Sequence, residues 1–140
     1  MARNLLKREE SYAVHALLNI AENPGTTAAE ISSQLEMPAA FMAKVLRKLV
    51  NAGFIESKMG RGGGVVLRVE PEEVTLLDVI EGVSGPVVLD ACQLKQACVT
   101  QRRKGHCNLK VAWISATLDI RERLASVSLA QLSDAPPGDR

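Results

Sequence analysis

The 140-residue sequence has few aromatic side chains, which make up only 3% of the chain. Proteins that bind single-stranded nucleic acid stack successive bases on aromatic side chains, so this scarcity argues against such a function and favours a helical core of aliphatic residues. The sequence also has no apolar run long enough to span a bilayer, and residues 1–10 are charged and lack the apolar core of a signal peptide. We therefore expect a cytoplasmic protein with no membrane contact.

Motifs of structural zinc and of common enzymes are also absent. There is no Cys-x2-Cys pair, and the glycine run Gly62–Gly64 lacks the following Lys-Ser/Thr of a phosphate-binding loop. Three cysteines are an odd number, which does not suit a disulfide framework. We therefore expect that the protein is not an enzyme. The alternative from that class is a small thiol oxidoreductase that uses Cys98 or Cys107.

A helix with one apolar and one basic face is expected between Pro38, which can open it, and Gly53, which can close it. Its apolar residues recur at the spacing of one buried helix face. They are Met42, Val45, Leu46 and Leu49. A polar stripe repeats the same spacing two positions later, and so lies on roughly the opposite face. It consists of Lys44, Arg47, Lys48 and Asn51.

The segments around this helix predict a winged helix-turn-helix. A first helix is expected over Glu9–Asn23, and Thr27 and Glu30 form a capping box that begins a second. Two β-type runs, Phe54–Ser57 and Val65–Val69, follow the basic helix and flank a glycine-rich turn. In this motif the second helix of the pair enters the major groove of duplex DNA, and the wing contacts the backbone or a minor groove. Residues 44–68 carry one acidic residue, Glu56, and six basic ones: Lys44, Arg47, Lys48, Lys58, Arg61 and Arg68.

The C-terminal half predicts a long helix that pairs two copies of the chain. Thr75 and Asp78 begin a short helix that ends at Gly85, and a helical pattern then runs from Asn108 to about Val127. The long helix has two apolar stripes, one through Trp113 and Ile120 and another through Val111, Ile114 and Leu118. Because a chain of this size supplies few partners for the second stripe, we expect a homodimer through this helix.

The expected fold class is therefore mostly α with a small β-wing: a winged helix-turn-helix followed by a long dimerisation helix. Residues 1–70 would form the DNA-binding region and residues 71–132 the cysteine loop and dimerisation helix. Residues 133–140 are rich in Pro and Gly and would form a disordered tail. Ser128 and Gln131 form a further capping box and predict a last turn of helix.

A loop with the spacing Cys92-x5-Cys98-x8-Cys107 lies between the two C-terminal helices. Basic residues surround the cysteines, and residues 91–118 contain no carboxylate. Positive surroundings lower thiol pKa values and offset the charge of a thiolate-bound iron–sulfur cluster. Three interpretations stay open: cluster ligation, a cluster-free redox switch, and inert cysteines.

The sequence resembles the IscR/NsrR family of bacterial repressors in five features taken together. They are Tyr12-Ala13-Val14, the helix-turn-helix, the glycine-rich wing, the three-cysteine loop and Trp113. The resemblance covers about residues 1–132. It implies a dimeric transcription regulator, most simply a repressor, that binds an operator in double-stranded DNA. It also implies an iron–sulfur cluster, 2Fe–2S or 4Fe–4S, that senses iron–sulfur status, nitric oxide or redox stress and controls operator binding. A cluster-free thiol switch is the alternative.

The resemblance assigns cluster ligation to Cys92, Cys98 and Cys107. It assigns DNA contacts to Lys44, Arg47, Lys48 and the wing residues Gly60, Arg61 and Gly62. The last cysteine spacing is longer than the usual pattern in the family, and Lys110 stands where such members have a ligating histidine. Other members recruit a fourth ligand from the partner's first helix, which makes His15, Glu9 and Glu10 candidates beside Lys110.

Overall fold

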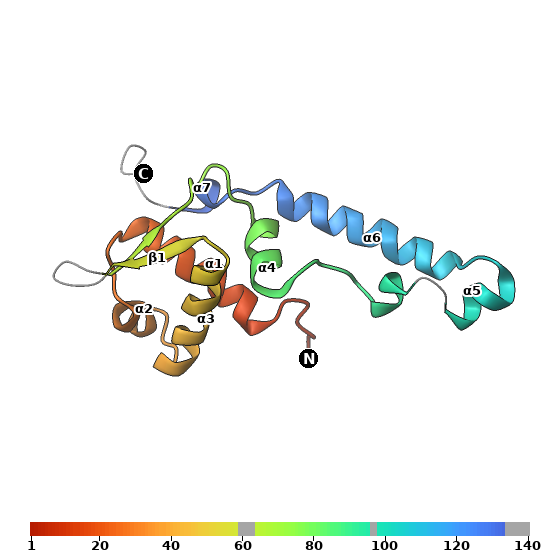
Figure 1. The fold of residues 1–140 in the computed structure, drawn as a ribbon, viewed down its shortest axis with the longest axis horizontal. Coiled ribbons are helices and arrows are strands. Elements are labelled where there is room, and N and C mark those ends of the chain that lie inside the picture. Colours follow the sequence, from red (N-terminus) through yellow and green to blue (C-terminus); the bar gives the residue numbers. More distant parts are fainter. Residues whose placement is uncertain (59–63, 96–97, 134–140) are drawn as a thin grey trace.

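The computed structural model describes residues 1–58, 64–95 and 98–133 of the chain (Figure 1). These residues form two parts, which we call the head and the arm (Figure 1). The head contains α1 (Arg8–Glu22), α2 (Ala28–Gln34), α3 (Ala39–Asn51), β1 (Ile55–Lys58), β2 (Gly64–Leu67), α4 (Leu76–Ser84) and α7 (Leu129–Leu132). The arm contains the 3-10 helix η1 (Ala91–Leu94), α5 (Val99–Lys104) and α6 (Asn108–Ala125). The expected fold class, mostly helical with a two-stranded wing, is confirmed.

The helix-turn-helix consists of α2 and α3. The Thr27 hydroxyl caps α2 by accepting the Glu30 N–H at 3.2 Å. The expected reciprocal bond from Glu30 is not formed, because its carboxylate accepts the Thr26 hydroxyl at 3.0 Å instead. The turn passes through Glu36, whose backbone φ is 52°. Residues other than glycine rarely adopt a positive φ outside tight turns.

The α3 helix has the apolar face expected from the sequence, and Met42, Val45, Leu46 and Leu49 are all buried. Pro38 is the residue that precedes the first helical position, rather than that position itself. It has an extended conformation with ψ of 140°, and its carbonyl accepts the first intrahelical bond, from the Met42 N–H.

The wing is an antiparallel pair in which Ile55 lies opposite Leu67 and Lys58 opposite Gly64. The first strand begins and ends one residue later than expected, and the second ends two residues earlier. The base of the wing is fixed to the turn after α1, because the Val65 N–H donates to Thr26 and the Gly25 N–H donates to Val65. Gly64 permits this approach, since a Cβ atom there would lie 2.1 Å from the Gly25 carbonyl oxygen.

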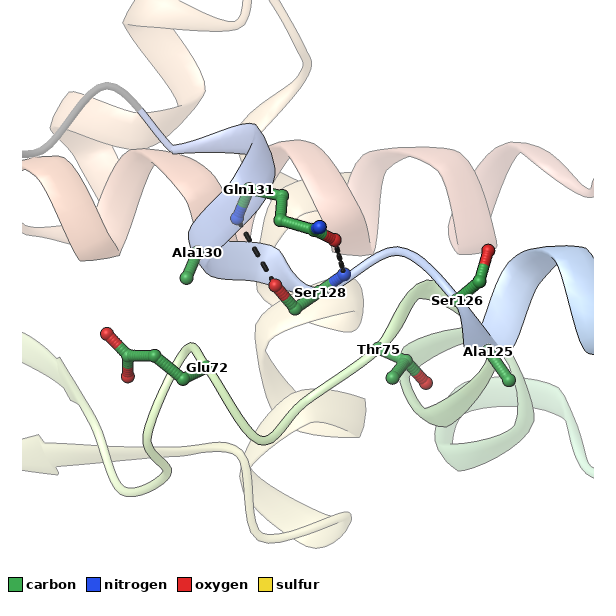
Figure 2. A pocket seen from close by; sticks show the side chains of 7 residues that line it. All are labelled: Glu72, Thr75, Ala125, Ser126, Ser128, Ala130 and Gln131. Carbon is green, nitrogen blue, oxygen red and sulfur yellow. Dashed lines mark hydrogen bonds between the residues drawn. The ribbon is translucent and has the colours of Figure 1, made fainter.

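The C-terminal residues complete the core of the head. Val79 of α4 and Leu129 of α7 are fully buried in the same cluster as Leu17 of α1 and Leu49 of α3. The core therefore draws on both regions expected from the sequence. Figure 2 shows how α7 begins, with the Ser128 hydroxyl accepting the Gln131 N–H and the Gln131 side chain accepting the Ser128 N–H.

The capping box expected at the start of α4 is also present. The Asp78 N–H donates to the Thr75 hydroxyl, and the Thr75 N–H donates to the Asp78 carboxylate. The helix ends at Gly85, whose φ is 87°. Just before α4, the backbone of residues 74–76 pairs with residues 127–129, which holds α7 against the start of the helix.

The arm carries its cysteines in a short helix or directly before one rather than on an irregular loop, which corrects the sequence-based expectation. Cys92 lies in η1, Cys98 precedes α5 and Cys107 precedes α6. The α6 helix runs back toward the head, where an ion pair between Arg121 and Glu81 holds it against α4 (Figure 1).

Within the described residues, α6 buries only Thr117, and the stripe expected to form a dimer contact is exposed. The exposed fractions are 65% for Val111, 40% for Ile114 and 59% for Leu118. Across the described ranges, no helix is both long enough and apolar enough to cross a membrane.

Candidate functional site: a reading head and a cysteine arm

The basic stripe of α3 is divided by its contacts with α1. Lys44 forms an ion pair with Glu9 at 2.8 Å, and Lys48 binds the other oxygen of the same carboxylate. These two lysines hold the pKa of Glu9 at about 2, mainly through their hydrogen bonds to it. Arg47 is exposed on the outer face of α3, and the described part of the chain supplies no ion pair to it. The sequence analysis named Glu9 only as a candidate cluster ligand and missed its ion pairs with α3.

The remaining DNA-contact candidates lie in or near the wing. Lys58 is exposed at the end of β1, beside the turn. Arg68 lies 3.8 Å from Glu56, so one basic residue of this region is partly neutralised across the sheet. The candidates Gly60, Arg61 and Gly62 fall outside the residues that the structure describes.

Cys98 and Cys107 occupy equivalent places at the starts of adjacent helices. The Cys98 sulfur accepts the Gln101 N–H at 3.4 Å, and the Cys107 sulfur accepts the Lys110 N–H at 3.4 Å. The Gln101 N–H lowers the pKa of the Cys98 thiol, and a hydrogen bond from the Cys107 thiol acts in the same direction. Thiolates are favoured at helix N-termini because unpaired N–H groups point at the sulfur. The structure thus brings these two cysteines together.

Cys92 has a different environment. The pKa of its thiol is raised mainly by burial, and a hydrogen bond to the Asp90 carboxylate raises it further. Asp90 begins η1 by accepting the Cys92 N–H at 2.9 Å. The sequence analysis missed this acid because the carboxylate-free segment begins one residue later. The expectation that basic neighbours lower the thiol pKa values is therefore wrong for Cys92. The pKa of Cys98 is lowered, but the leading cause is a backbone N–H group rather than a basic side chain.

The candidate fourth ligands lie in contrasting surroundings. The Lys110 ammonium donates to the Lys95 carbonyl at 2.6 Å, which joins the end of η1 to the start of α6. His15 is exposed on α1, with its ring 5.5 Å from that of Tyr12. The Glu10 carboxylate is buried and accepts the Lys7 N–H, while Glu9 binds the two lysines of α3. In one chain the head that carries His15 lies far from the arm tip (Figure 1), so His15 could reach the cysteines only from a second copy.

The donor set at the arm tip is chemically suited to an iron–sulfur cluster, since it contains three free thiols and two of them accept backbone N–H groups. Thiolates ligate such clusters, and hydrogen bonds to the sulfurs help to offset their charge. Among the described residues, no group of three or more His, Cys, Asp or Glu side chains has an arrangement that could hold a metal ion. Ligation by all three cysteines would therefore need a rearrangement of the arm tip that brings the three sulfurs closer together.

A pocket lies elsewhere, between the segment before α4, the end of α6 and the start of α7 (Figure 2). Its lining residues are Glu72, Thr75, Ala125, Ser126, Ser128, Ala130 and Gln131. None of these is a cysteine, a histidine or a basic residue, so the pocket supplies neither a thiol or imidazole ligand for a metal nor a cation for DNA.

Comparisons with known proteins agree with this arrangement. The Rrf2 family, described as iron-dependent transcriptional regulators, matches residues 6–135. IscR of Aliivibrio salmonicida, an HTH-type transcriptional regulator, is 30% identical over 125 residues, which cover 86% of this chain and 72% of that protein. BadM of Rhodopseudomonas palustris is 39% identical over 77 residues, and the match spans about half of its length, 49%.

The fold is also that of solved regulators. The structure of CymR, the global cysteine regulator of B. subtilis, superposes with a TM-score of 0.72 at 23% identity and covers 95% of this chain and 97% of CymR. The family match extends over the head and the arm alike. The chain therefore belongs to the Rrf2 family and is a DNA-binding transcriptional regulator with a winged helix-turn-helix fold.

Proposed function

We propose that the protein is a homodimeric, cytoplasmic repressor whose operator binding is controlled by an iron–sulfur cluster held by Cys92, Cys98 and Cys107. The observation that carries this proposal is the pair of sulfurs at the N-termini of α5 and α6, because one of them, Cys107, begins the helix that joins the arm to the head. The family description as iron-dependent regulators supports it. A bound cluster would supply chemistry that responds to iron supply, nitric oxide or oxidants.

The chain's own residues then link the cysteines to DNA. Cys107 begins α6, and α6 is fixed to α4 by Arg121 and Glu81. Glu81 also accepts the Val87 N–H at 2.8 Å, so it joins the segment leading to the cysteines to the same point. Movement at the arm tip would shift the equilibrium between two positions of α6 relative to the head. A signal that passes from the cysteines to the DNA-binding helix needs such a two-state element.

The test is to purify the protein without oxygen and measure its visible absorption, iron and acid-labile sulfide. We expect a coloured protein with matched iron and sulfide, and loss of colour when Cys92, Cys98 or Cys107 is replaced by Ala. The iron-to-dimer ratio then distinguishes 2Fe–2S from 4Fe–4S, and Lys110→Ala and His15→Ala identify the fourth ligand by a changed spectrum. A protein that stays colourless after cluster reconstitution would contradict the proposal.

A cluster-free thiol switch is the second candidate, and one observation favours it. The Gln101 N–H, with a smaller contribution from the neighbouring Cys107 thiol, lowers the pKa of Cys98, so its thiolate is suited to attack an oxidised Cys107 sulfur. If this candidate is right, the colourless protein would still lose or gain DNA affinity on oxidation. The Cys98→Ser variant would then bind DNA equally well in oxidised and reduced conditions.

For DNA recognition we propose that Arg47 reads a base edge while Lys44, Lys48, Lys58 and the Gly60–Gly62 segment contact phosphates. Arg47 is exposed on the outer face of α3, and none of the ion pairs among the described residues involves it. Arg47→Ala should cost about 1–3 kcal/mol of operator affinity and relax specificity at one base pair, measured on duplexes selected from a randomised pool. Lys58→Ala should instead weaken binding to every duplex similarly and reduce its salt dependence. An unchanged operator affinity in both variants would exclude this reading surface.

A further inference from the structure

The ion pairs between α1 and α3 place a carboxylate on the DNA-reading surface. Glu9 bridges Lys44 and Lys48, one oxygen to each ammonium. Lys44 and Lys48 lie one helical turn apart, so their ammonium groups project together on the flank of α3 that faces α1. A single carboxylate thus occupies the two lysines of the recognition helix that would otherwise be free to bind DNA.

The packing of α1 determines where Glu9 lies. The neighbouring residue, Arg8, places its guanidinium 5.3 Å from the ring of Phe41 on α3 and 6.0 Å from that of Tyr12. The same guanidinium lies 3.7 Å from the Met37 sulfur. These contacts fix the first turn of α1 against α3. The packing of the two helices therefore holds the Glu9 carboxylate beside the two lysines.

The competing ligand is the DNA backbone. A recognition helix in the major groove has phosphates along both of its flanks, and lysines there displace condensed counterions from the duplex. A phosphate and the Glu9 carboxylate are both anions that need the same ammonium donors. Because one negative charge cancels one of the two positive charges, the bridged pair offers DNA a net charge of one rather than two.

We propose that Glu9 is a built-in competitor for phosphate that lowers the sequence-independent part of DNA affinity. Arg47 forms no ion pair within the described chain, so Glu9 weakens phosphate contacts while it leaves the proposed base-reading residue available. The operator and unrelated sequences would lose phosphate affinity alike. Specific binding then depends more strongly on the base contacts. This inference rests on the proposed use of Lys44 and Lys48 as phosphate contacts.

The test compares Glu9→Gln with the wild-type dimer on one mixed-sequence duplex and one selected operator, over a series of salt concentrations. Gln has the same shape without the charge. We expect affinity for both duplexes to rise by about three- to thirtyfold at low salt, since two exposed ion pairs no longer compete. We also expect the slope of log affinity against log salt to steepen by about one contact. Glu73→Gln removes a charge from an exposed site in the segment before α4 and is the matched control, with an expected change below twofold.

Two further results separate the possible failures. In the Lys44→Ala, Lys48→Ala background, Glu9→Gln should have no effect, because the carboxylate then has no lysines to release. If Glu9→Gln weakens binding instead, Glu9 orients the lysines toward DNA and the inference is overturned. An unchanged affinity in a protein that binds duplexes with strong salt dependence overturns it as well. If the wild-type protein shows no salt-dependent binding to any duplex, the proposed DNA surface itself has failed.

Discussion

The head and the arm of this protein treat their apolar residues in opposite ways. In the head, Leu17, Met42, Leu49 and Leu129 are fully buried around one core. In the arm, Leu94, Val99, Val111 and Leu118 are each at least 59% exposed. The head therefore has the core that an independently stable unit needs, whereas the arm has apolar surface that one chain leaves uncovered.

The largest expected effect follows from covering the arm with a second copy. Leu118→Glu should convert the proposed dimer to a monomer, because a two-fold interface places the charge in the apolar contact twice. Burial of a leucine contributes about 1.5–3 kcal/mol. Loss of two buried leucines, one from each copy, should weaken dimerisation at least about a hundredfold, as sedimentation equilibrium would measure. The control is Glu122→Gln, at an exposed polar position of the same helix. A Leu118→Glu protein that remains dimeric would show that α6 is not the interface.

The second prediction compares the same substitution in the two parts. Leu17→Ala should lower the free energy of unfolding by about 2–5 kcal/mol, since it leaves a cavity in a close-packed core. Leu94→Ala, at a position that is 70% exposed in η1, should change it by no more than about 0.5 kcal/mol. Denaturant unfolding followed by circular dichroism would measure both. Similar losses in the two variants would mean that the arm is packed as tightly as the head.

The third prediction concerns the contact that fixes the wing to the head. Gly53→Ala should cost about 1–2 kcal/mol, because φ is 86° there but a Cβ would meet nothing within 4 Å. Gly64→Ala should cost more, since its Cβ would also overlap the Gly25 backbone and push the wing away. Thermal unfolding would rank the two variants. Equal losses would mean that the wing shifts freely at its base. Because the wing contributes Lys58, we also expect weaker duplex binding from Gly64→Ala alone.

The head could be predicted from the sequence because its signals are local. Apolar periodicity located α1 and α3, and hydroxyl caps located α4 and α7, to within one or two residues. The Thr27 cap was only half right, since Glu30 found a hydroxyl partner in Thr26, and side-chain choices of this kind depend on tertiary neighbours. The charge pairing of Glu9 with Lys44 and Lys48 joins residues that are far apart in the chain, so no helical spacing could reveal it.

The cysteine arm was less predictable for a related reason. Its three cysteines were visible, but the environments of Cys92 and Cys98 depend on helices too short to give a periodic signal. The cap at Cys98 belongs to a helix of 6 residues and the Asp90 cap to one of 4. Counting charges in the surrounding sequence indicated one common environment. Backbone N–H groups and one carboxylate instead make the environments of Cys98 and Cys92 different.

The smallest expected effect follows from the different environments of Cys92 and Cys98. It is a difference in alkylation rate between these two thiols in the cluster-free, reduced protein. The thiolate is the reactive form, so the rate rises with pH through the pKa of each thiol. Because the pKa of Cys98 is lowered and that of Cys92 is raised, Cys98 should react faster at neutral pH and reach half of its maximal rate at lower pH. Iodoacetamide labelling followed by mass spectrometry of the two peptides would measure both profiles.

A change at Asp90 tests the cause of that difference. Asp90→Asn removes the charge but keeps an oxygen that can accept the Cys92 N–H, so η1 should remain. The profile of Cys92 should move part of the way toward lower pH, since burial contributes more than Asp90 to its raised pKa, and the profile of Cys98 should stay unchanged. If both profiles move together, the two thiols titrate as one coupled group, and the arm tip offers a single environment rather than two.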